Sequence, residues 1–186
     1  SHQEELKQHG IEDVEININY DAEQDILTIT DTAFGMERDD FARAVKVDSP
    51  PENKNGRNEF GMGLKTAASW FGNIWSVQST QYGSSNQYFT EINIPEMREK
   101  NINTVTIHRT HVDPSTHGTT IIIRNLFYNT PARMKFMKAD TVEGSRVTAA
   151  VQLQALAHPE VAIQLIKDGK SVLSTPGSGA LRDAVY

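Results

Sequence analysis

A carboxylate at the end of an alternating stretch is the first feature of this sequence that suggests chemistry. Ile26 to Thr30 alternates as a strand does, and Asp31 follows it, with Ala33, Gly35 and Met36 just beyond. A carboxylate at a strand end can accept a hydrogen bond from an exocyclic amine such as adenine N6, and a glycine lets a flat ring approach the backbone. An ordinary turn has the same pattern, so this segment alone leaves both interpretations open.

A second group of residues places two glycines directly before a predicted helix. The group consists of Phe60, Gly61, Met62, Gly63, Leu64 and Lys65. The first N–H groups of a helix are unpaired and lie at its positive end, so they can bind phosphates, and Lys65 adds a positive charge. The spacing matches neither the dinucleotide pattern Gly-x-Gly-x-x-Gly nor the P-loop. A glycine-rich connector before a helix is the simpler alternative.

Strands and helices alternate around these two groups. Hydrophobic periodicity predicts strands over 14–20, 26–30, 74–80, 87–94, 105–109 and 119–124. It predicts a short helix over 37–47 and another over 63–71, with a long polar loop over 48–59 between them. The expected fold is mixed α/β with antiparallel strands, and Trp70 and Trp75 are expected in its core.

The last third of the chain is predicted to be helical and then to form a hairpin. Pro131 begins one helix, and Val142 to Ala157 forms another. Its expected apolar stripe is Val147, Val151, Leu153 and Leu156. Asp168-Gly169 is a strong hairpin signal between strands over 161–166 and 171–173, and we expect a new sheet to start there.

Composition excludes several classes of protein. The 186 residues have a formal charge of −6, so the whole chain is not a basic nucleic-acid binder. Residues 1–118 hold 10 basic and 19 acidic side chains, giving −9, whereas residues 119–186 hold 8 and 5, giving +3. There is no cysteine and no apolar run of roughly 20 residues, and the six histidines lack metal-ligand spacing. We expect a soluble, cytoplasmic protein without a metal site in these residues.

The order of these pieces resembles the GHKL ATPase family. Asp31-x-x-x-Gly35, a short helix, a polar loop, Gly61-x-Gly63 and a later strand opened by Gly118-Thr119 follow one another as they do in gyrase B subunits, heat-shock chaperones of the ninety-kilodalton class, histidine kinases and MutL. The resemblance implies a Bergerat fold, an α+β two-layer sandwich with a mixed, largely antiparallel sheet, that binds ATP with Mg²⁺.

The resemblance also implies roles for individual residues. Asp31 binds adenine, Gly35 and Met36 line the base pocket, and Thr119 supports the adenine contact. The full set of implied nucleotide-binding residues is Asp31, Ala33, Gly35, Met36, Phe60, Gly61, Met62, Gly63, Leu64, Lys65 and Thr119.

The chain departs from the family pattern in two places. The family usually has Asn and Gly where Thr32 and Ala33 stand. In the family a helix about thirty residues before the adenine Asp carries a general-base Glu and, four residues later, an Asn that holds Mg²⁺. Only 30 residues precede Asp31, and Glu15 and Asn19, which match that spacing, lie in a predicted strand. We therefore expect nucleotide binding, assign no catalytic residue and no metal ligand, and leave the ATPase activity open.

Residues from about Thr119 to Tyr186 resemble the bacterial MutL family of DNA mismatch repair proteins. The run Leu126-Phe-Tyr-Asn-Thr-Pro-Ala-Arg133 joins the ATPase module to a transducer domain in that family. The resemblance implies an ATPase module over 1–125, a helical connector over 126–157 and the start of a transducer domain like domain 2 of ribosomal protein S5 over 158–186. It further implies DNA and MutS-type repair proteins as partners and an ATP-driven homodimer, with no membrane association.

The first two thirds of the chain resemble other GHKL proteins more than MutL. The Gly-Phe-Arg-Gly-Glu-Ala-Leu stretch of MutL is absent, and Phe60 to Lys65 is more similar to microrchidia-type proteins and bacterial defence or restriction relatives. Our hypothesis is a chimera joined near Gly118-Thr119-Thr120, where the charge also changes sign; a divergent natural homologue is the alternative. ATP binding in a mismatch-repair setting is the leading function. The alternatives are a GHKL ATPase of a defence or microrchidia-like system and an inactive nucleotide-binding fragment.

Overall fold

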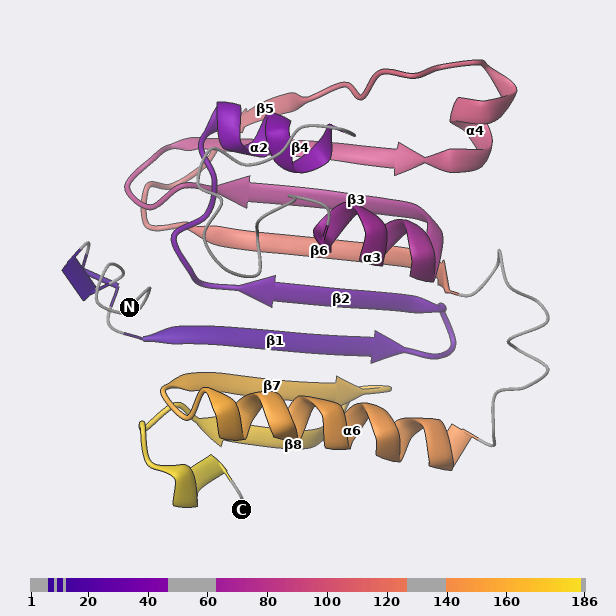
Figure 1. Ribbon diagram of the computed structural model, residues 1–186. Helices are drawn as coiled ribbons and strands as arrows, with labels where there is room; N and C mark the ends of the chain where they lie inside the picture. Colours follow the sequence, from indigo (N-terminus) through magenta and orange to yellow (C-terminus); the bar gives the residue numbers. More distant parts are fainter. Residues whose placement is uncertain (1–6, 9, 12, 47–62, 127–139, 185–186) are drawn as a thin grey trace.

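The computed structural model describes residues 7–8, 10–11, 13–46, 63–126 and 140–184 and contains one eight-stranded sheet (Figure 1). Its strands are β1 (Val14–Asp21), β2 (Ile26–Asp31), β3 (Gly72–Thr80), β4 (Asn86–Asn93), β5 (His108–His111), β6 (Gly118–Leu126), β7 (Val161–Lys167) and β8 (Lys170–Pro176). The helices are α2 (Arg38–Val45), α3 (Gly63–Phe71), α4 (Ile94–Glu99), α6 (Asp140–Ala157) and the 3₁₀ helix η2 (Leu181–Ala184).

The sheet and three of its helices form two layers. The strand order is β5-β4-β3-β6-β2-β1-β7-β8, and every neighbouring pair is antiparallel except β1 with β7. Helices α2, α3 and α6 lie on the same face of the sheet (Figure 1). The predicted α+β two-layer fold with a mixed, largely antiparallel sheet is confirmed. Within the described residues, no helix combines the length and apolar character needed to cross a membrane.

Strand register decides which side chains share the helix-covered face. Ile16 pairs with Asp31 across β1 and β2, and Ile18 pairs with Ile29. Directly paired residues point to the same face of an antiparallel sheet, and successive residues alternate. The isoleucines of β1 therefore share a face with Asp31, and Asn17 lies on the opposite face.

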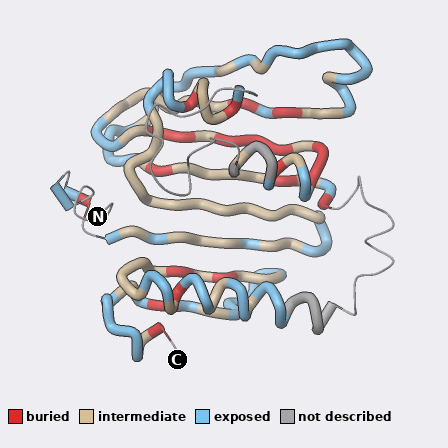
Figure 2. The backbone as a smooth tube through the Cα atoms, viewed as in Figure 1, coloured by how far each residue is buried: buried red, intermediate tan, exposed pale blue. Residues whose placement is uncertain are grey.

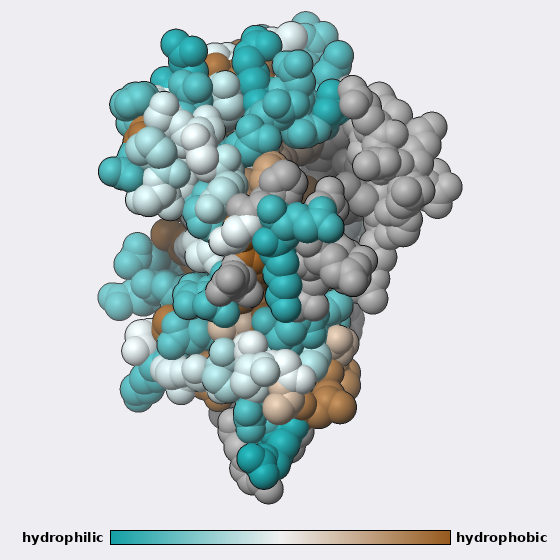
Figure 3. Space-filling model, turned by 90° about the vertical axis from the view of Figure 1, so that its left-hand side faces the viewer, coloured by the Kyte–Doolittle hydropathy of each residue, from teal (hydrophilic) through white to brown (hydrophobic). Residues whose placement is uncertain are grey.

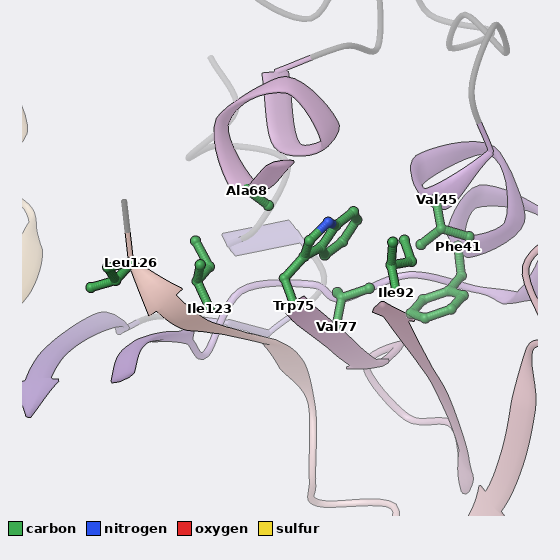
Figure 4. Close-up of a cluster of buried hydrophobic side chains, with 8 residues drawn as sticks. All are labelled: Phe41, Val45, Ala68, Trp75, Val77, Ile92, Ile123 and Leu126. Carbon is green, nitrogen blue, oxygen red and sulfur yellow. The ribbon is translucent and has the colours of Figure 1, made fainter. Parts of the chain in front are cut away.

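The core lies between β3, β4, β6 and the helices α2 and α3. Its buried side chains, drawn in Figure 4, are Phe41, Val45, Ala68, Trp75, Val77, Ile92, Ile123 and Leu126. Strand β3 is buried along most of its length (Figure 2). Its position between two strands and under α3 explains this burial, because both edges are paired and the helix covers one face.

The C-terminal hairpin joins this sheet and does not start a new one. Strand β7 pairs in parallel with β1, from Val14 beside Val161 to Tyr20 beside Lys167. The Asp168 carboxylate also accepts a hydrogen bond of 2.8 Å from the backbone N–H of Ala22. The prediction of a separate sheet was therefore wrong, because it considered only the local hairpin signal. The assignment of residues 158–186 to a transducer domain stays a prediction.

Three side chains that were predicted to be buried are exposed. Val147 and Leu153 of α6 are 51% and 65% exposed, whereas Ala155 is fully buried. Leu153 follows Val151 by two residues, which is about 200° around a helix, so the two cannot lie on one stripe. Trp70 is 54% exposed at the end of α3, whereas Trp75 is in the core as predicted.

The orientation of α6 is testable with two substitutions. Ala155→Leu should lower the free energy of unfolding by about 1 to 3 kcal/mol, because the added side chain overpacks a filled position. Leu153→Ala removes an exposed side chain and should change the free energy of unfolding by less than about 0.5 kcal/mol. Urea unfolding of both variants measures these values. A large loss for Leu153→Ala with none for Ala155→Leu would contradict the orientation.

Candidate nucleotide-binding site

Asp31 ends β2 on the helix-covered face of the sheet, between Ile16 of β1 and Thr119 of β6. Its Oδ1 accepts a hydrogen bond of 3.0 Å from the N–H of Ala33 and one of 3.2 Å from the N–H of Thr119. Within the described residues, no hydrogen bond reaches Oδ2. One oxygen of the carboxylate therefore fixes the loop, and the other remains an acceptor for a ligand.

Burial raises the pKa of the Asp31 carboxyl above its ordinary value. The two backbone N–H groups and the nearby His117 act in the opposite direction and offset only part of this effect. A carboxylate that is costly to ionise and is held by fixed donors is more typical of a binding site than of a surface turn.

The elevated pKa predicts a pH-dependent difference between the wild type and Asp31→Asn. Below the pKa of about 3.9 for an unfolded aspartate, both states are protonated and burial costs no charge. As the pH rises through the raised folded pKa, the wild type loses stability that the neutral variant keeps. The melting temperature of Asp31→Asn minus that of the wild type should therefore grow between pH 4 and pH 7. Thermal melts at both pH values measure this difference. A difference that stays constant with pH would contradict a raised pKa of Asp31.

Ser79 holds the far end of the loop and was missed by the sequence analysis. Its hydroxyl oxygen accepts a hydrogen bond of 2.9 Å from the backbone N–H of Met36. The same oxygen lies 2.9 Å from the hydroxyl oxygen of Thr119. It also lies 3.1 Å from the carbonyl oxygen of Gly118. Ser79 is 1% exposed, so these bonds are shielded from water. One serine of β3 thus joins Met36 to the Gly118-Thr119 pair predicted from the sequence.

Two glycines allow the backbones around Asp31 to pack in direct contact. Gly35 has a φ of +70°, and a Cβ there would lie 1.9 Å from the carbonyl oxygen of Thr80. Gly118 has a φ of +103°, and its Cβ would lie 2.0 Å from the carbonyl oxygen of Asp31. No other residue fits either position without moving the backbone, so the loop over 31–36 and the start of β6 are built around glycine.

Three rings contact one another at the loop over 31–36, namely those of Phe34, Tyr82 and His117. Tyr82 donates its backbone N–H to the carbonyl of Phe34 over 2.8 Å, and the two rings stack with centroids 6.4 Å apart. The His117 ring meets Tyr82 edge to face at 5.1 Å, and its Nδ1 lies 2.9 Å from the carbonyl oxygen of Ala33. Figure 3 views the molecule from the side on which β2 ends, where most of the coloured surface is hydrophilic.

Thr32 stands where the family usually has Asn, and it binds β1. Its hydroxyl accepts a hydrogen bond of 2.9 Å from the N–H of Glu15, and its own N–H donates to the carbonyl of Glu15 over 3.1 Å. Thr32 lacks the side-chain amide of the usual Asn. Its two hydrogen bonds to Glu15 instead continue the pairing of β1 with β2.

The second predicted group lies partly outside the described residues. Phe60, Gly61 and Met62 lie outside them, as does the side chain of Lys65. Gly63 begins α3 as predicted, and Leu64 packs against the core cluster together with Met36. Helix α3 is followed directly by β3, and the N-terminal end of the helix lies toward the end of the sheet where β2 ends (Figure 1).

The described residues hold no family-type catalytic pair. Glu15 and Asn19 lie in β1, and the alternation of the strand puts both on the face opposite Asp31. Within the described part of the chain, no group of three or more His, Asp or Glu side chains is arranged to hold a metal ion. These described residues therefore do not form a Mg²⁺ centre by themselves.

A small apolar cavity adjoins the site under α6. Its volume is about 190 Å³, below the roughly 300 Å³ at which ligand pockets usually begin. The residues that line it are Ile16, Ile18, Val151, Gln154, His158, Val161 and Ile163. We do not place a nucleotide there, because only Gln154 and His158 offer polar groups.

A family model matches the part of the chain that holds this site. The model described as "Histidine kinase-, DNA gyrase B-, and HSP90-like ATPase" matches residues 8–119, more than half of the chain. The chain belongs to this family of ATPases. The match includes Asp31, the loop to Met36 and Thr119, and it confirms the GHKL resemblance.

Relatives of this chain include bacterial DNA mismatch repair proteins. MutL of Clostridium tetani is 50% identical over 68 residues, which is 37% of this chain and 11% of the relative. MutL of Streptococcus agalactiae is 47% identical over 79 residues, which is 42% of this chain and 12% of the relative. The matched stretch thus spans about a tenth of the length of these relatives.

Solved structures confirm the fold of this chain. The Aquifex aeolicus MutL ATPase domain complexed with ADP has a TM-score of 0.65 and 18% identity, and the match covers 98% of this chain and 62% of that one. The N-terminal domain of a DNA repair protein has a TM-score of 0.66 and 18% identity, covering 98% of this chain and 54% of that one. At this identity the likeness concerns the fold alone.

Proposed function

We propose that this chain binds an adenine nucleotide with the loop over 31–36 and the start of β6. The observation that supports the proposal is the Asp31 carboxylate, whose Oδ1 is held by the N–H groups of Ala33 and Thr119. The carboxylate is oriented before any ligand binds, so little ordering is needed when the ligand arrives. Gly35 and Met36 then form the wall of the base pocket.

Hydrogen-bond chemistry selects adenine over guanine at this position. An ionised carboxylate is an acceptor only, and adenine presents an exocyclic N6 amine that donates to it. Guanine has a carbonyl oxygen at the corresponding position, and two acceptors face to face repel each other. Oδ2 of Asp31 is the acceptor that we assign to adenine N6.

The phosphates are assigned to the segment that precedes and begins α3. In our proposal Phe60, Gly61 and Met62 cover them, while Gly63, Leu64 and Lys65 supply N–H groups and a positive charge. A helix N-terminus attracts anions because its first N–H groups are unpaired and its dipole is positive there. The N-terminal end of α3 lies toward the end of the sheet where β2 ends at Asp31, which supports this orientation.

We propose nucleotide binding and assign no residue to hydrolysis. A general base contributes on the order of a hundred- to ten-thousandfold in rate, and Glu15 lies on the opposite face of the sheet from Asp31. Mg²⁺ belongs to the ligand that we expect, but we assign it no described residue.

Mismatch repair is the setting that the relatives support. Two MutL proteins are 50% and 47% identical to this chain over 68 and 79 residues. A solved MutL ATPase domain with bound ADP shares the fold over 98% of the chain. We propose that the chain acts as a MutL-like module, with DNA, MutS-type proteins and an ATP-driven homodimer as its partners. The boundaries 1–125, 126–157 and 158–186, and the joining of two sources near Gly118, remain part of this proposal.

Calorimetry with two nucleotides tests the proposed function. We expect ADP to bind the wild-type chain in the micromolar range, with Mg²⁺ present in all titrations. GDP should bind at least about tenfold more weakly, because losing one hydrogen bond to a charged group costs about 1.5 to 3 kcal/mol. Equal affinity for ADP and GDP would contradict the role of Asp31. No binding of either nucleotide to a folded chain would contradict the proposed function itself.

A further inference from the structure

We propose that His117 is a positioning residue that holds the base-binding loop in its binding conformation through the carbonyl of Ala33. The inference rests on the proposed function and deepens it, because it names a residue outside the implied set of nucleotide ligands. His117 directly precedes the Gly118-Thr119 pair, and its ring crosses from the start of β6 to the loop that follows β2.

The geometry of the ring supports this role. His117 Nδ1 lies 2.9 Å from the carbonyl oxygen of Ala33, and a carbonyl oxygen only accepts. Nδ1 therefore carries the proton and donates it. The edge-to-face contact with Tyr82, with centroids 5.1 Å apart and an interplanar angle of 76°, fixes the ring from the other side.

Ala33 is the residue through which this bond acts on Asp31. Its N–H donates to Oδ1 of Asp31 over 3.0 Å, while its carbonyl accepts from His117. The peptide groups on both sides of Ala33 are thus held in place, and the carboxylate is oriented by a residue that is itself fixed. Loss of the histidine bond would free the carbonyl and loosen the Asp31 side chain.

The consequence for binding is pre-organisation. A loop that is already ordered loses little conformational freedom when a ligand binds, whereas a loose loop must be ordered at the expense of affinity. The other fixed points, Ser79 on Met36 and Tyr82 on Phe34, lie further along the loop and do not replace the bond at Ala33. His117 therefore affects nucleotide affinity without contacting the nucleotide.

Two substitutions separate the hydrogen bond from the ring packing. His117→Asn keeps a donor close to the position of Nδ1 and removes the ring that contacts Tyr82. His117→Phe keeps a ring for Tyr82 and removes the donor. Thermal melts establish that both variants are folded before any other measurement.

Hydrogen exchange of the amides of residues 31–36 in the nucleotide-free chain is the first readout. We expect faster exchange in His117→Phe and near-wild-type exchange in His117→Asn. Unchanged exchange in His117→Phe, or equally fast exchange in both variants, would overturn the inference, whether or not the chain binds nucleotide.

The dissociation constant for ADP is the second readout. His117→Phe should raise it about three- to tenfold, the effect of one hydrogen bond, and His117→Asn should stay within about twofold of the wild type. Wild-type affinity in His117→Phe would overturn the inference and leave the proposed function intact. Absence of binding in the wild type would instead contradict the proposed function, and the exchange data would still decide whether His117 positions the loop.

Discussion

Asp31→Ala is expected to abolish ADP binding that is measurable in the wild type. The substitution removes the acceptor assigned to adenine N6 and also leaves the N–H groups of Ala33 and Thr119 without their shared partner. A hydrogen bond to a charged group is worth about 1.5 to 3 kcal/mol, and each unsatisfied buried donor costs about 1 to 3 kcal/mol. The expected loss of affinity is therefore at least about a hundredfold, measured by calorimetry.

Asp31→Asn is the matched control for this variant. The amide oxygen of asparagine can still accept from Ala33 and Thr119, so the loop keeps its shape while the carboxylate charge is lost. We expect Asp31→Asn to weaken ADP binding less than Asp31→Ala does. Wild-type affinity in Asp31→Ala, with the variant shown to be folded, would mean that Asp31 does not bind the base.

Gly35→Ala is expected to destabilise the fold severely. A Cβ at Gly35 would lie 1.9 Å from the carbonyl oxygen of Thr80, which is backbone and cannot turn away, and the residue has a φ of +70°. The combined clash and strain should lower the free energy of unfolding by about 4 kcal/mol or more, a loss that only a few mechanisms produce. Urea unfolding followed by tryptophan fluorescence measures it.

Gly83→Ala separates the clash from the backbone strain. Gly83 has a φ of +74°, close to that of Gly35, but nothing lies within 4 Å of its Cβ position. A left-handed conformation alone costs an alanine about 1 to 2 kcal/mol, so the loss at Gly83 should stay in that range. Similar losses at the two positions would show that the contact between Gly35 and Thr80 is not formed.

The sequence predicts well those elements that depend on local pattern. The alternation in β1 and β2 and the range of α3 from Gly63 to Phe71 were correctly predicted. Strand alternation and glycine as a helix boundary both act over a few residues, so they are visible without the fold. The resemblance to a known family then placed Gly118-Thr119 beside Asp31. Thr119, whose N–H donates to Asp31, is 88 residues away from it in sequence.

Residues that act across the sheet could not be found in this way. Ser79 and His117 reach the loop only because β3 pairs with β6 and β6 pairs with β2. A serine in a strand and a histidine before a glycine have no distinguishing local pattern. The strand register is the signal that identifies them, since Ser79 pairs with Thr119 and Thr119 pairs with Asp31.

The C-terminal errors share a cause. A hairpin signal at Asp168-Gly169 is local, whereas the parallel pairing of β7 with β1 joins segments about 147 residues apart, from Val14 to Val161. In α6 the apolar residues are spread around the helix, so no single stripe in the sequence shows which side faces the sheet. Among the described side chains of α6, the small Ala155 is buried and the large Leu153 is exposed.

A crystal structure of this chain with bound ADP tests the central claim most directly. The account predicts the adenine N6 within hydrogen-bond distance, about 3 Å, of Oδ2 of Asp31, with the ring beside Gly35 and the phosphates at the first turn of α3. An adenine ring bound elsewhere, or bound at this site with N6 turned away from Asp31, would contradict it.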